Sequence, residues 1–215
     1  MNKNYKDVVI IDRKTTYIAD DAVVERNVII YPNNYVDSGS VIKENSTLLP
    51  GNYIIGSTIG KGSKLHNSVV ENAFIGECSI VGPFSHIRPN SKLGQNVKVG
   101  NFCEIKNSIV GDNTKISHHA YVGDAEIGQN CNISCGVIFA NYDGAKKHKS
   151  YVGNNCFIGC NCNIISPIVL ADNSYICAGA TIRQSTKEND FVIQKNDYVI
   201  KENYKTKYIR KKQNA

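Results

Sequence analysis

The sequence contains no tryptophan, only five prolines and one methionine among its 215 residues, and it has no long apolar run. Its apolar stretches are much shorter than the roughly 20 residues that a membrane-spanning helix needs. No basic stretch followed by an apolar segment marks a secretory leader at the N-terminus. We therefore expect a soluble, cytoplasmic protein with no membrane partner.

A strong excess of one charge is also absent from the body of the chain. The formal net charge is +6, but most of it comes from a cluster near the C-terminus: Lys201, Lys205, Lys207, Arg210, Lys211 and Lys212. A near-neutral body offers no broad basic face, so we predict no nucleic-acid partner.

The eight cysteines lack the paired C-x-x-C spacing of a structural zinc site. A disulfide framework is not expected in a chain without a secretory leader, so we predict reduced thiols and no metal. Four cysteines occupy small inward positions of the repeat described next, where a free cysteine acts as a small hydrophobe: Cys103, Cys131, Cys156 and Cys162.

What the sequence does contain is a period of six residues. Aliphatic residues recur at this step in one long run: Ile18, Val24, Ile30, Val36, Ile42, Leu48 and Ile54. A small residue follows four positions later, as at Ser40 and Ser46, with Asn34 as an exception. This period is neither the 3.6 of a helix nor the alternation of a solvated strand. It is typical of a parallel β-helix, in which three hexads complete a coil and asparagine-rich corners adopt left-handed backbone conformations.

The hexads predict one elongated all-β domain over residues 16–183, with roughly nine coils. At about 4.8 Å per coil the prism would be about 40–45 Å long, with open strand edges only at its two ends. Residues 1–15 are assigned to an N-terminal segment, and residues 184–215 to a C-terminal arm and basic tail. In the arm, Phe191-Val192-Ile193 and Tyr198-Val199-Ile200 carry enough apolar surface to pack somewhere.

One interruption breaks the repeat, at residues 139–151. It contains Asn141-Tyr142-Asp143-Gly144 followed by Lys146 and Lys147. A solenoid gains no packing from such an excursion, so the segment is either a binding loop on one face or a tolerated surface insertion. Composition alone weights the two interpretations about equally.

Four motifs, in this order along the chain, resemble one bacterial family. They read Val81-Gly82-Pro83-Phe84-Ser85-His86-Ile87-Arg88-Pro89, Gly100-Asn101-Phe102-Cys103-Glu104-Ile105-Lys106-Asn107, Ser117-His118-His119-Ala120-Tyr121-Val122-Gly123-Asp124-Ala125-Glu126-Ile127-Gly128 and Asn141-Tyr142-Asp143-Gly144. From about Val8 to about Lys195 the chain is similar to the acetyltransferase half of the bacterial bifunctional enzyme that makes UDP-N-acetylglucosamine.

The resemblance implies a left-handed β-helix that assembles as a homotrimer. It also implies transfer of an acetyl group from acetyl-CoA, as cosubstrate, to glucosamine-1-phosphate without a metal. The handedness comes from the resemblance alone, because parallel crossovers are right-handed in most folds. No Gly-rich nucleotide loop precedes the repeat, so we expect no uridylyltransferase activity.

Acetyl transfer to an amine requires a base for the ammonium proton, donors for the tetrahedral oxyanion and cations for the phosphate. By the resemblance, His118 is the base, and Glu104, one coil away by hexad count, orients it. The backbone N–H of Cys135 is the oxyanion donor. Arg88 and Lys106 bind the sugar phosphate, for which a guanidinium is well suited because it can hold two oxygens at once.

The other assignments implied by the resemblance complete the two substrate sites. Tyr121 lies beside the phosphate, and Lys147 is a loop cation that reaches a neighbouring subunit's site. Sugar and amine contacts are assigned to Asn132, Asn141 and Tyr142. Coenzyme A contacts are assigned to Cys135, Cys160, Ala178 and Lys195. The competing interpretation is that each asparagine is a corner residue, each lysine is solvated and Glu104 is a surface residue.

The chain departs from the family on the acetyl-CoA side. Where the family has Gly-Ala-Gly-Thr, this chain has Ser134-Cys135-Gly136-Val137, and Cys160 and Lys195 replace a serine and an arginine. A backbone donor survives a side-chain change, but a larger side chain brings bulk close to the thioester. We therefore expect efficiency with acetyl-CoA to be affected more than recognition of the sugar.

Three other hypotheses stay open. The same chemistry could serve another amino sugar or a longer acyl donor. A non-catalytic scaffold predicts decay at the base and phosphate positions, and none is visible. A metal hydratase on this fold needs three histidines between subunits, but the five present include an adjacent pair that cannot both point inward and no H-x4-H spacing: His66, His86, His118, His119 and His148.

Overall fold

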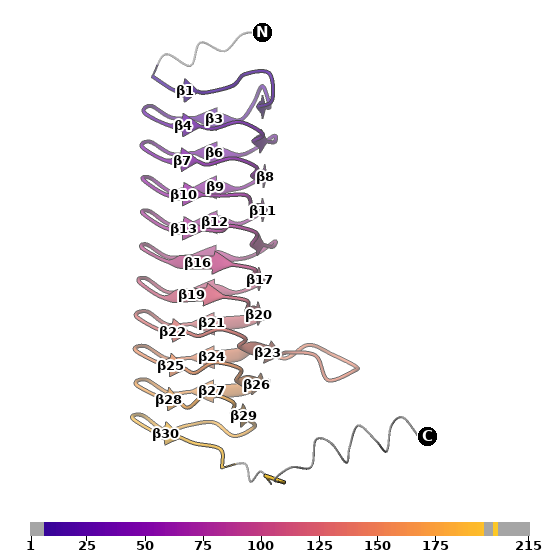
Figure 1. Cartoon of the computed structure of the whole chain (residues 1–215), viewed down its shortest axis with the longest axis vertical. Helices are drawn as coiled ribbons and strands as arrows, with labels where there is room; N and C mark the ends of the chain where they lie inside the picture. Colours follow the sequence, from indigo (N-terminus) through magenta and orange to yellow (C-terminus); the bar gives the residue numbers. More distant parts are fainter. Residues whose placement is uncertain (1–6, 196–199, 202–215) are drawn as a thin grey trace.

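The computed structural model describes residues 7–195 and 200–201, and within these ranges its secondary structure consists of short parallel strands. The strands form three sheets of eleven, ten and nine strands, which are the three sides of a prism (Figure 1). Each coil adds one strand to each sheet, so the prism has about ten coils. The predicted fold class is confirmed.

The strands of each sheet are hydrogen-bonded to their neighbours one coil above and below. The first sheet contains β1 (Val9–Ile10), β4 (Ile29–Ile30), β7 (Thr47–Leu48), β10 (Lys64–Leu65), β13 (Ile80–Val81), β16 (Lys98–Asn101), β19 (Lys115–His118), β22 (Asn132–Ile133), β25 (Phe157–Ile158), β28 (Tyr175–Ile176) and β30 (Phe191–Val192). The second contains β2 (Tyr17–Ile18), β5 (Tyr35–Val36), β8 (Tyr53–Ile55), β11 (Val69–Glu71), β14 (His86–Ile87), β17 (Glu104–Lys106), β20 (Tyr121–Gly123), β23 (Ile138–Ala140), β26 (Asn163–Ile165) and β29 (Thr181–Ile182). The third contains β3 (Val23–Val24), β6 (Val41–Ile42), β9 (Thr58–Ile59), β12 (Phe74–Ile75), β15 (Lys92–Leu93), β18 (Ile109–Val110), β21 (Ala125–Ile127), β24 (Ser150–Val152) and β27 (Ile168–Leu170).

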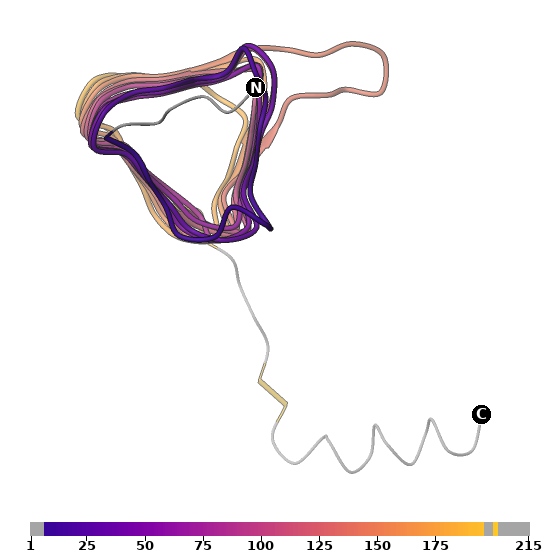
Figure 2. The same cartoon turned by 90° about the horizontal axis from the view of Figure 1, so that it is seen from above.

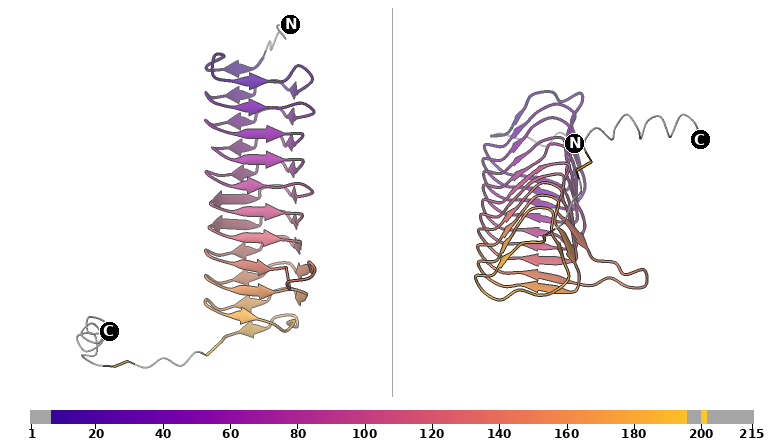
Figure 3. Two further views of the ribbon diagram at one scale, coloured as in Figure 1. Left: turned by 90° about the vertical axis from the view of Figure 1, so that its right-hand side faces the viewer. Right: turned by 60° about the horizontal axis from the view of Figure 1, so that its bottom comes forward.

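The coil is left-handed. In Figure 1 the chain runs from left to right along the near sheet and returns from right to left along the far sheet. Seen from above, each coil is a triangle, and the chain turns anticlockwise as it descends from the N-terminus (Figure 2). Figure 3 shows the triangular coils stacked in register along the whole prism.

The core is built from the two inward positions of each hexad. From Ile30 onward the aliphatic position is buried, and the small position is filled by residues such as Ser46, Ser63 and Cys103. Buried serines are satisfied locally, because Ser46 and Ser63 each donate to a glycine carbonyl one coil away at 2.8 Å. The exceptional Asn34 is also buried, and its Oδ1 accepts a 2.8 Å bond from Asn52 Nδ2.

Asparagine holds most of the corners that have positive φ. Five other non-glycine residues share this conformation: Cys78, Phe84, Phe102, His119 and Asp124. Asparagine tolerates left-handed backbone better than other residues with a Cβ, so the predicted role of its abundance is confirmed. The two bulky aromatics and His119 are unusual at positive φ, and all three lie beside the site described below.

The β-helix is longer than the hexad count predicted. Strand β1, which lies in the expected N-terminal segment, pairs with β4 of the prism. Strand β30, which lies beyond Arg183, pairs with β28. The excursion leaves the prism between β23 and β24, at residues 141–149, and projects from the edge between the second and third sheets (Figure 2). In the arm, Phe191 and Val192 form β30, whereas Tyr198 and Val199 lie outside the described residues. The described residues contain no helix able to span a membrane.

Candidate active site

Several predicted site residues stack in one column along the edge where the first sheet turns into the second. We call this the edge column: Asn101, His118, Cys135, Cys160 and Ala178. Strand pairing aligns Asn101 with His118. The isoleucines of β19, β22, β25 and β28 are aligned with one another, and His118 and the later members of the column each lie two residues after one of them. The register continues through the corners, because Asn161 N donates to Cys135 O and Gly179 N donates to Cys160 O, each at 2.8 Å.

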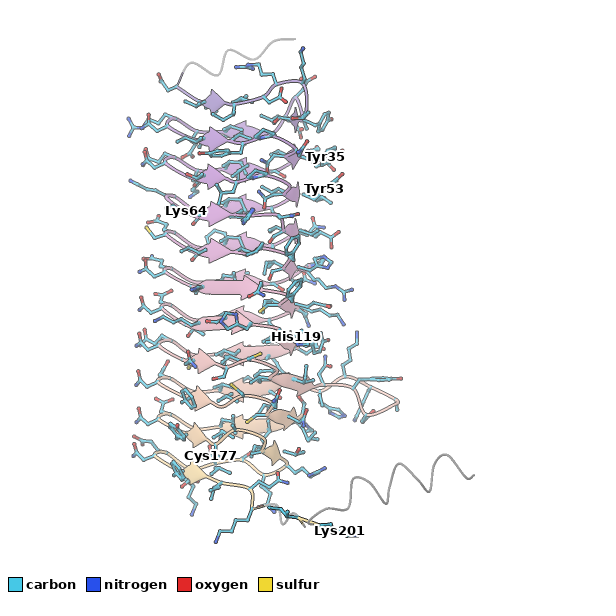
Figure 4. The ribbon with its side chains drawn as sticks, in the orientation of Figure 1. Tyr35, Tyr53, Lys64, His119, Cys177 and Lys201 are labelled. Carbon is cyan, nitrogen blue, oxygen red and sulfur yellow. The ribbon has the colours of Figure 1, made fainter. Side chains whose placement is uncertain are left out.

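His118, the predicted base, ends β19 and is exposed to solvent. Its Nδ1 lies 2.9 Å from Asn101 Oδ1, one coil toward the N-terminus. The next residue, His119, is exposed at positive φ, and Figure 4 places it at the prism edge just above the projecting loop. Sequence reasoning missed Asn101, although it lies inside the second motif.

Glu104 occupies a different column from His118. Strand pairing aligns Glu104 with Tyr121, and its Oε1 accepts a 2.7 Å bond from Arg88 Nη1. No hydrogen bond in the described part of the chain joins Glu104 to His118. The hexad count is thus corrected: Glu104 precedes His118 by fewer residues than a complete coil contains, and Asn101 is the residue one coil away.

Three cations gather where the second sheet turns toward the third. Arg88 directly follows β14, and Lys106 ends β17 one coil below, because Ile87 and Ile105 are aligned. Lys147 approaches Lys106 from the loop of the same chain, and this ammonium lowers the pKa of Lys106. The Glu104 carboxylate raises the pKa of the Arg88 guanidinium. Two lysine ammonium groups held side by side disfavour each other unless an anion lies between them, so the arrangement suits a phosphate.

A buried carboxylate ties the base of the loop to the prism. Asp124 is 9% exposed and accepts a 2.5 Å bond from Asn107 Nδ2 and a second bond from Asn141 Nδ2. The predicted sugar contact Asn141 is therefore itself mostly buried and held in place. Glycine at 123 leaves room for Tyr121, because a Cβ there would lie 2.4 Å from the tyrosine hydroxyl.

The loop is organised by its own hydrogen bonds. Asp143 accepts from the backbone N–H groups of Ala145 and Lys146, each at 2.8 Å, and its Oδ2 lies 2.6 Å from His148 Nε2. These bonds, the Lys146 N–H foremost, lower the pKa of Asp143. Tyr142 is exposed and donates its hydroxyl to Gly144 O at 2.7 Å. The loop therefore presents Lys147 from a defined scaffold.

The predicted acetyl-CoA residues lie lower on the prism. Cys135 and Cys160 are exposed, and Lys195 is exposed after β30. No hydrogen bond among the described residues uses the N–H of Cys135, although Gly136 N donates to His119 O at 3.0 Å beside it. On β22, Asn132 faces outward, and its Nδ2 donates to Ser134 Oγ at 3.1 Å.

An aromatic ladder that sequence reasoning missed continues down the first sheet below Asn132. Phe157, Tyr175 and Phe191 stack with centroid distances of 4.6 and 5.1 Å. The strand register places them one below another on the outer face. Their spacing in the sequence matches a coil, which is the signal that could have found them.

Metal ligation has no geometric support in the described residues, where no group of three or more His, Cys, Asp or Glu side chains is placed to hold an ion. Two of the five histidines are engaged by carboxylates instead. His86 Nε2 lies 2.7 Å from Glu71, and His148 pairs with Asp143.

Comparison with known proteins finds two family models and several relatives that are similar to this chain. A family model described as bacterial transferase hexapeptide (six repeats) matches residues 149–184, and one described as GMPPB C-terminal domain matches residues 69–143. The bifunctional protein GlmU of Clostridium perfringens is 45% identical over 195 residues, which are 90% of this chain and 43% of that protein. The bifunctional protein GlmU of Caldicellulosiruptor saccharolyticus is 44% identical over 215 residues, covering 99% of this chain and 46% of that protein.

The chain thus spans less than half the length of these relatives. Among solved structures, an Arabidopsis UDP-N-acetylglucosamine acyltransferase matches with a TM-score of 0.61 at 15% identity, over 85% of this chain and 68% of that one. The structural match shows the fold alone, whereas the sequence matches confirm the family resemblance predicted from the four motifs.

Proposed function

We propose that this hexapeptide-repeat protein, as a relative of the GlmU proteins, transfers the acetyl group of acetyl-CoA to the amine of glucosamine-1-phosphate. The observation that carries the proposal is the arrangement along one side of the prism. An exposed histidine with one nitrogen already bonded, a free backbone donor and a cluster of three cations all lie on this side. These are the base, the oxyanion donor and the phosphate site that the reaction requires.

In the proposed mechanism, Arg88, Lys106 and Lys147 hold the phosphate, and Tyr121, Asn132, Asn141 and Tyr142 surround the sugar. His118 Nε2 takes a proton from the substrate ammonium, since only the free amine has a lone pair for attack. The amine nitrogen then forms a bond to the thioester carbonyl carbon, and the N–H of Cys135 stabilises the oxyanion. The carbon–sulfur bond breaks, and the imidazolium of His118 gives its proton to the coenzyme A thiolate. The nitrogen of the new amide releases its remaining extra proton to solvent water.

Coenzyme A would extend from Cys135 along the edge column past Cys160 and Ala178 toward Lys195. We also propose a homotrimer. Lys147 lies beside Lys106 of its own chain, so we place it in the phosphate site of the same subunit rather than in that of a neighbour. The flat outer faces carry exposed apolar residues such as Ile109, Ile138 and Val169, which another copy could cover. A single species of monomer mass in sedimentation at micromolar concentration would overturn the trimer.

The decisive assay incubates the protein with acetyl-CoA and glucosamine-1-phosphate, and measures N-acetylglucosamine-1-phosphate by mass spectrometry. Mass detection is preferable to a thiol reagent, because the exposed Cys78, Cys135 and Cys160 would react with the reagent themselves. Glucosamine without the phosphate should be acetylated far more slowly, because it offers no anion to the cluster of Arg88, Lys106 and Lys147. Equal rates with both sugars would overturn the phosphate assignment.

Adjacent histidines offer a matched pair of variants. His118→Ala should lower kcat by about 10²–10⁴ without unfolding the protein, as is typical when a general base is removed. His119→Asn is the control, because asparagine tolerates the positive φ at this position, and its activity should stay near wild type. If the control were crippled and His118→Ala remained active, every assignment would be one residue out of register.

A further inference from the structure

We propose that Asn101 is the residue that positions His118 as the base, by holding Nδ1 protonated so that Nε2 faces the substrate amine with its lone pair. The inference rests on the proposed function for its catalytic meaning. Asn101 acts through His118 and is a positioning residue. Nothing in the arrangement requires it to touch either substrate.

The strand register places the two residues together. Most strands of the prism have two or three residues, whereas β16 and β19 have four each. Their extra length carries the pairing to the prism edge, where Asn101 is aligned with His118. The side chains meet there with Oδ1 and Nδ1 2.9 Å apart. The contact is therefore a consequence of backbone pairing as well as of side-chain choice.

Glycine at position 100 makes this extension possible. A Cβ there would lie 1.8 Å from the carbonyl oxygen of Ser117, so only glycine lets the two strands approach so closely. One residue on, the carbonyl of Asn101 accepts a 2.9 Å bond from His119 N. Asn101 is thus anchored to the His118 segment by both its backbone and its side chain.

The chemistry of an amide oxygen determines the tautomer. A carbonyl oxygen only accepts, so the nitrogen that it contacts must carry the hydrogen. With Nδ1 protonated, the neutral ring has its lone pair at Nε2, which is the form a base needs. An uncharged amide also differs from a carboxylate in that it adds no negative charge to favour the imidazolium.

Other groups around His118 do not perform this task. The Glu104 carboxylate on β17 is bonded to Arg88 at 2.7 Å. Titratable groups near His118 include His119 on the same coil, Cys135 one coil below and Cys103 in the core behind them. Burial raises the pKa of the Cys103 thiol, which keeps it neutral.

The first test needs no substrate. In protein labelled with ¹⁵N-histidine, two-bond ¹H–¹⁵N spectra report which ring nitrogen of His118 carries the hydrogen, and a His118→Ala spectrum identifies the signals. Wild type should show a protonated Nδ1 and an unprotonated Nε2, and Asn101→Ala should show a mixture of tautomers. A wild-type ring with the hydrogen on Nε2 would mean that the Asn101 amide donates instead, and would overturn the inference.

The second test uses the reaction. Asn101→Ala should lower kcat by about tenfold or more with little change in either KM, since about 1.4 kcal/mol of orientation is a factor of ten in rate. Asn101→Asp keeps an acceptor oxygen at the same place but adds a charge. It should restore the tautomer and move the acidic limb of the kcat/KM profile to higher pH, because a nearby anion favours the imidazolium.

Asn163→Ala is the matched control, because Asn163 is an exposed strand asparagine of the second sheet whose side chain bonds only Thr181 among the described residues. It should leave the rate, the pH profile and the tautomer unchanged. An Asn101→Ala protein with wild-type kcat and pH profile would overturn the inference. If the wild type acetylated no glucosamine-1-phosphate while the tautomer still depended on Asn101, the proposed function would fall and the positioning role would stand.

Discussion

Replacement of Asp124 by alanine tests how the loop is held. Asp124 is almost fully buried at the foot of the loop, and its two carboxylate oxygens accept from Asn107 and Asn141. Its backbone carbonyl accepts from Ser150 N at 3.1 Å, where the chain re-enters the prism. In Asp124→Ala the two amides lose their acceptor while they remain at the loop base, so both stability and the position of Asn141 should change.

The magnitude follows from these contacts. A hydrogen bond to a charged group contributes about 1.5–3 kcal/mol, so the loss of two lowers the free energy of unfolding by at least about 3 kcal/mol. Asp124 has a φ of 50°, and alanine in this region is disfavoured by about 1 kcal/mol or more. At about 2 °C per kcal/mol for a protein of this size, Tm should fall by at least about 8 °C.

The assay combines thermal unfolding with steady-state kinetics below the lowered Tm. The KM for glucosamine-1-phosphate should rise, because Asn141 and the loop that carries Lys147 lose their common anchor, while the KM for acetyl-CoA should change little. Asp124→Asn is the control, since it tolerates the same backbone conformation and keeps one acceptor oxygen, and its effects should be smaller. If Asp124→Ala kept both Tm and the sugar KM of wild type, the carboxylate would not be what holds the loop.

Three further outcomes follow from the same geometry. Lys147→Met should weaken glucosamine-1-phosphate binding and move the alkaline loss of binding to higher pH, because Lys147 lowers the pKa of Lys106 in the wild type. In the wild type, Lys106 therefore loses its proton at a lower pH in the folded state than in the unfolded state. The free energy of unfolding should rise as pH increases through this lowered pKa, because the repulsion between the two ammonium groups is then lost. Phe139→Ala should cost about 3–5 kcal/mol of unfolding free energy by leaving a cavity, whereas truncation of the exposed Ile138 should cost far less. Cys135→Ala should lower the KM for acetyl-CoA while the backbone donor stays in place, and an unchanged KM would contradict crowding by the thiol.

The fold was predictable because the residues that pack in the core recur at a fixed period in the sequence. Each hexad needs one aliphatic and one small inward residue, so a run such as Ile30, Val36 and Ile42 fixes the period and the inward face together. The ends were not predictable on this basis. Strand β1 has only one neighbouring coil, and between β29 and β30 the chain passes the third sheet without forming a strand. Residues 183–190 therefore break the period, although Thr186 N still donates to Val169 O at 3.0 Å.

The structure brings several of the predicted site residues close together, but their individual contacts were not predictable from the sequence. The motifs identified His118 and Arg88, and the structure places Lys147 beside Lys106. Contacts depend on which column a residue occupies, and a complete coil here takes 17 residues between Asn101 and His118. His118 follows Glu104 by fewer residues than a complete coil contains, so the two residues do not lie one above the other. The residue one coil below Glu104 is Tyr121.

The stacked construction also explains where this chain can depart from its relatives. Exposed corner side chains such as Cys135 and Cys160 contribute neither to the core nor to the backbone ladder, so replacing them changes the surface that a ligand meets without unfolding a coil. Gly100 and Asp124 are different, because one permits the close approach of two strands and the other satisfies two buried amides. Variation on the acetyl-CoA side is therefore compatible with an unchanged fold. The same freedom does not extend to the glycine that lies beside the proposed base or to the carboxylate that holds the loop.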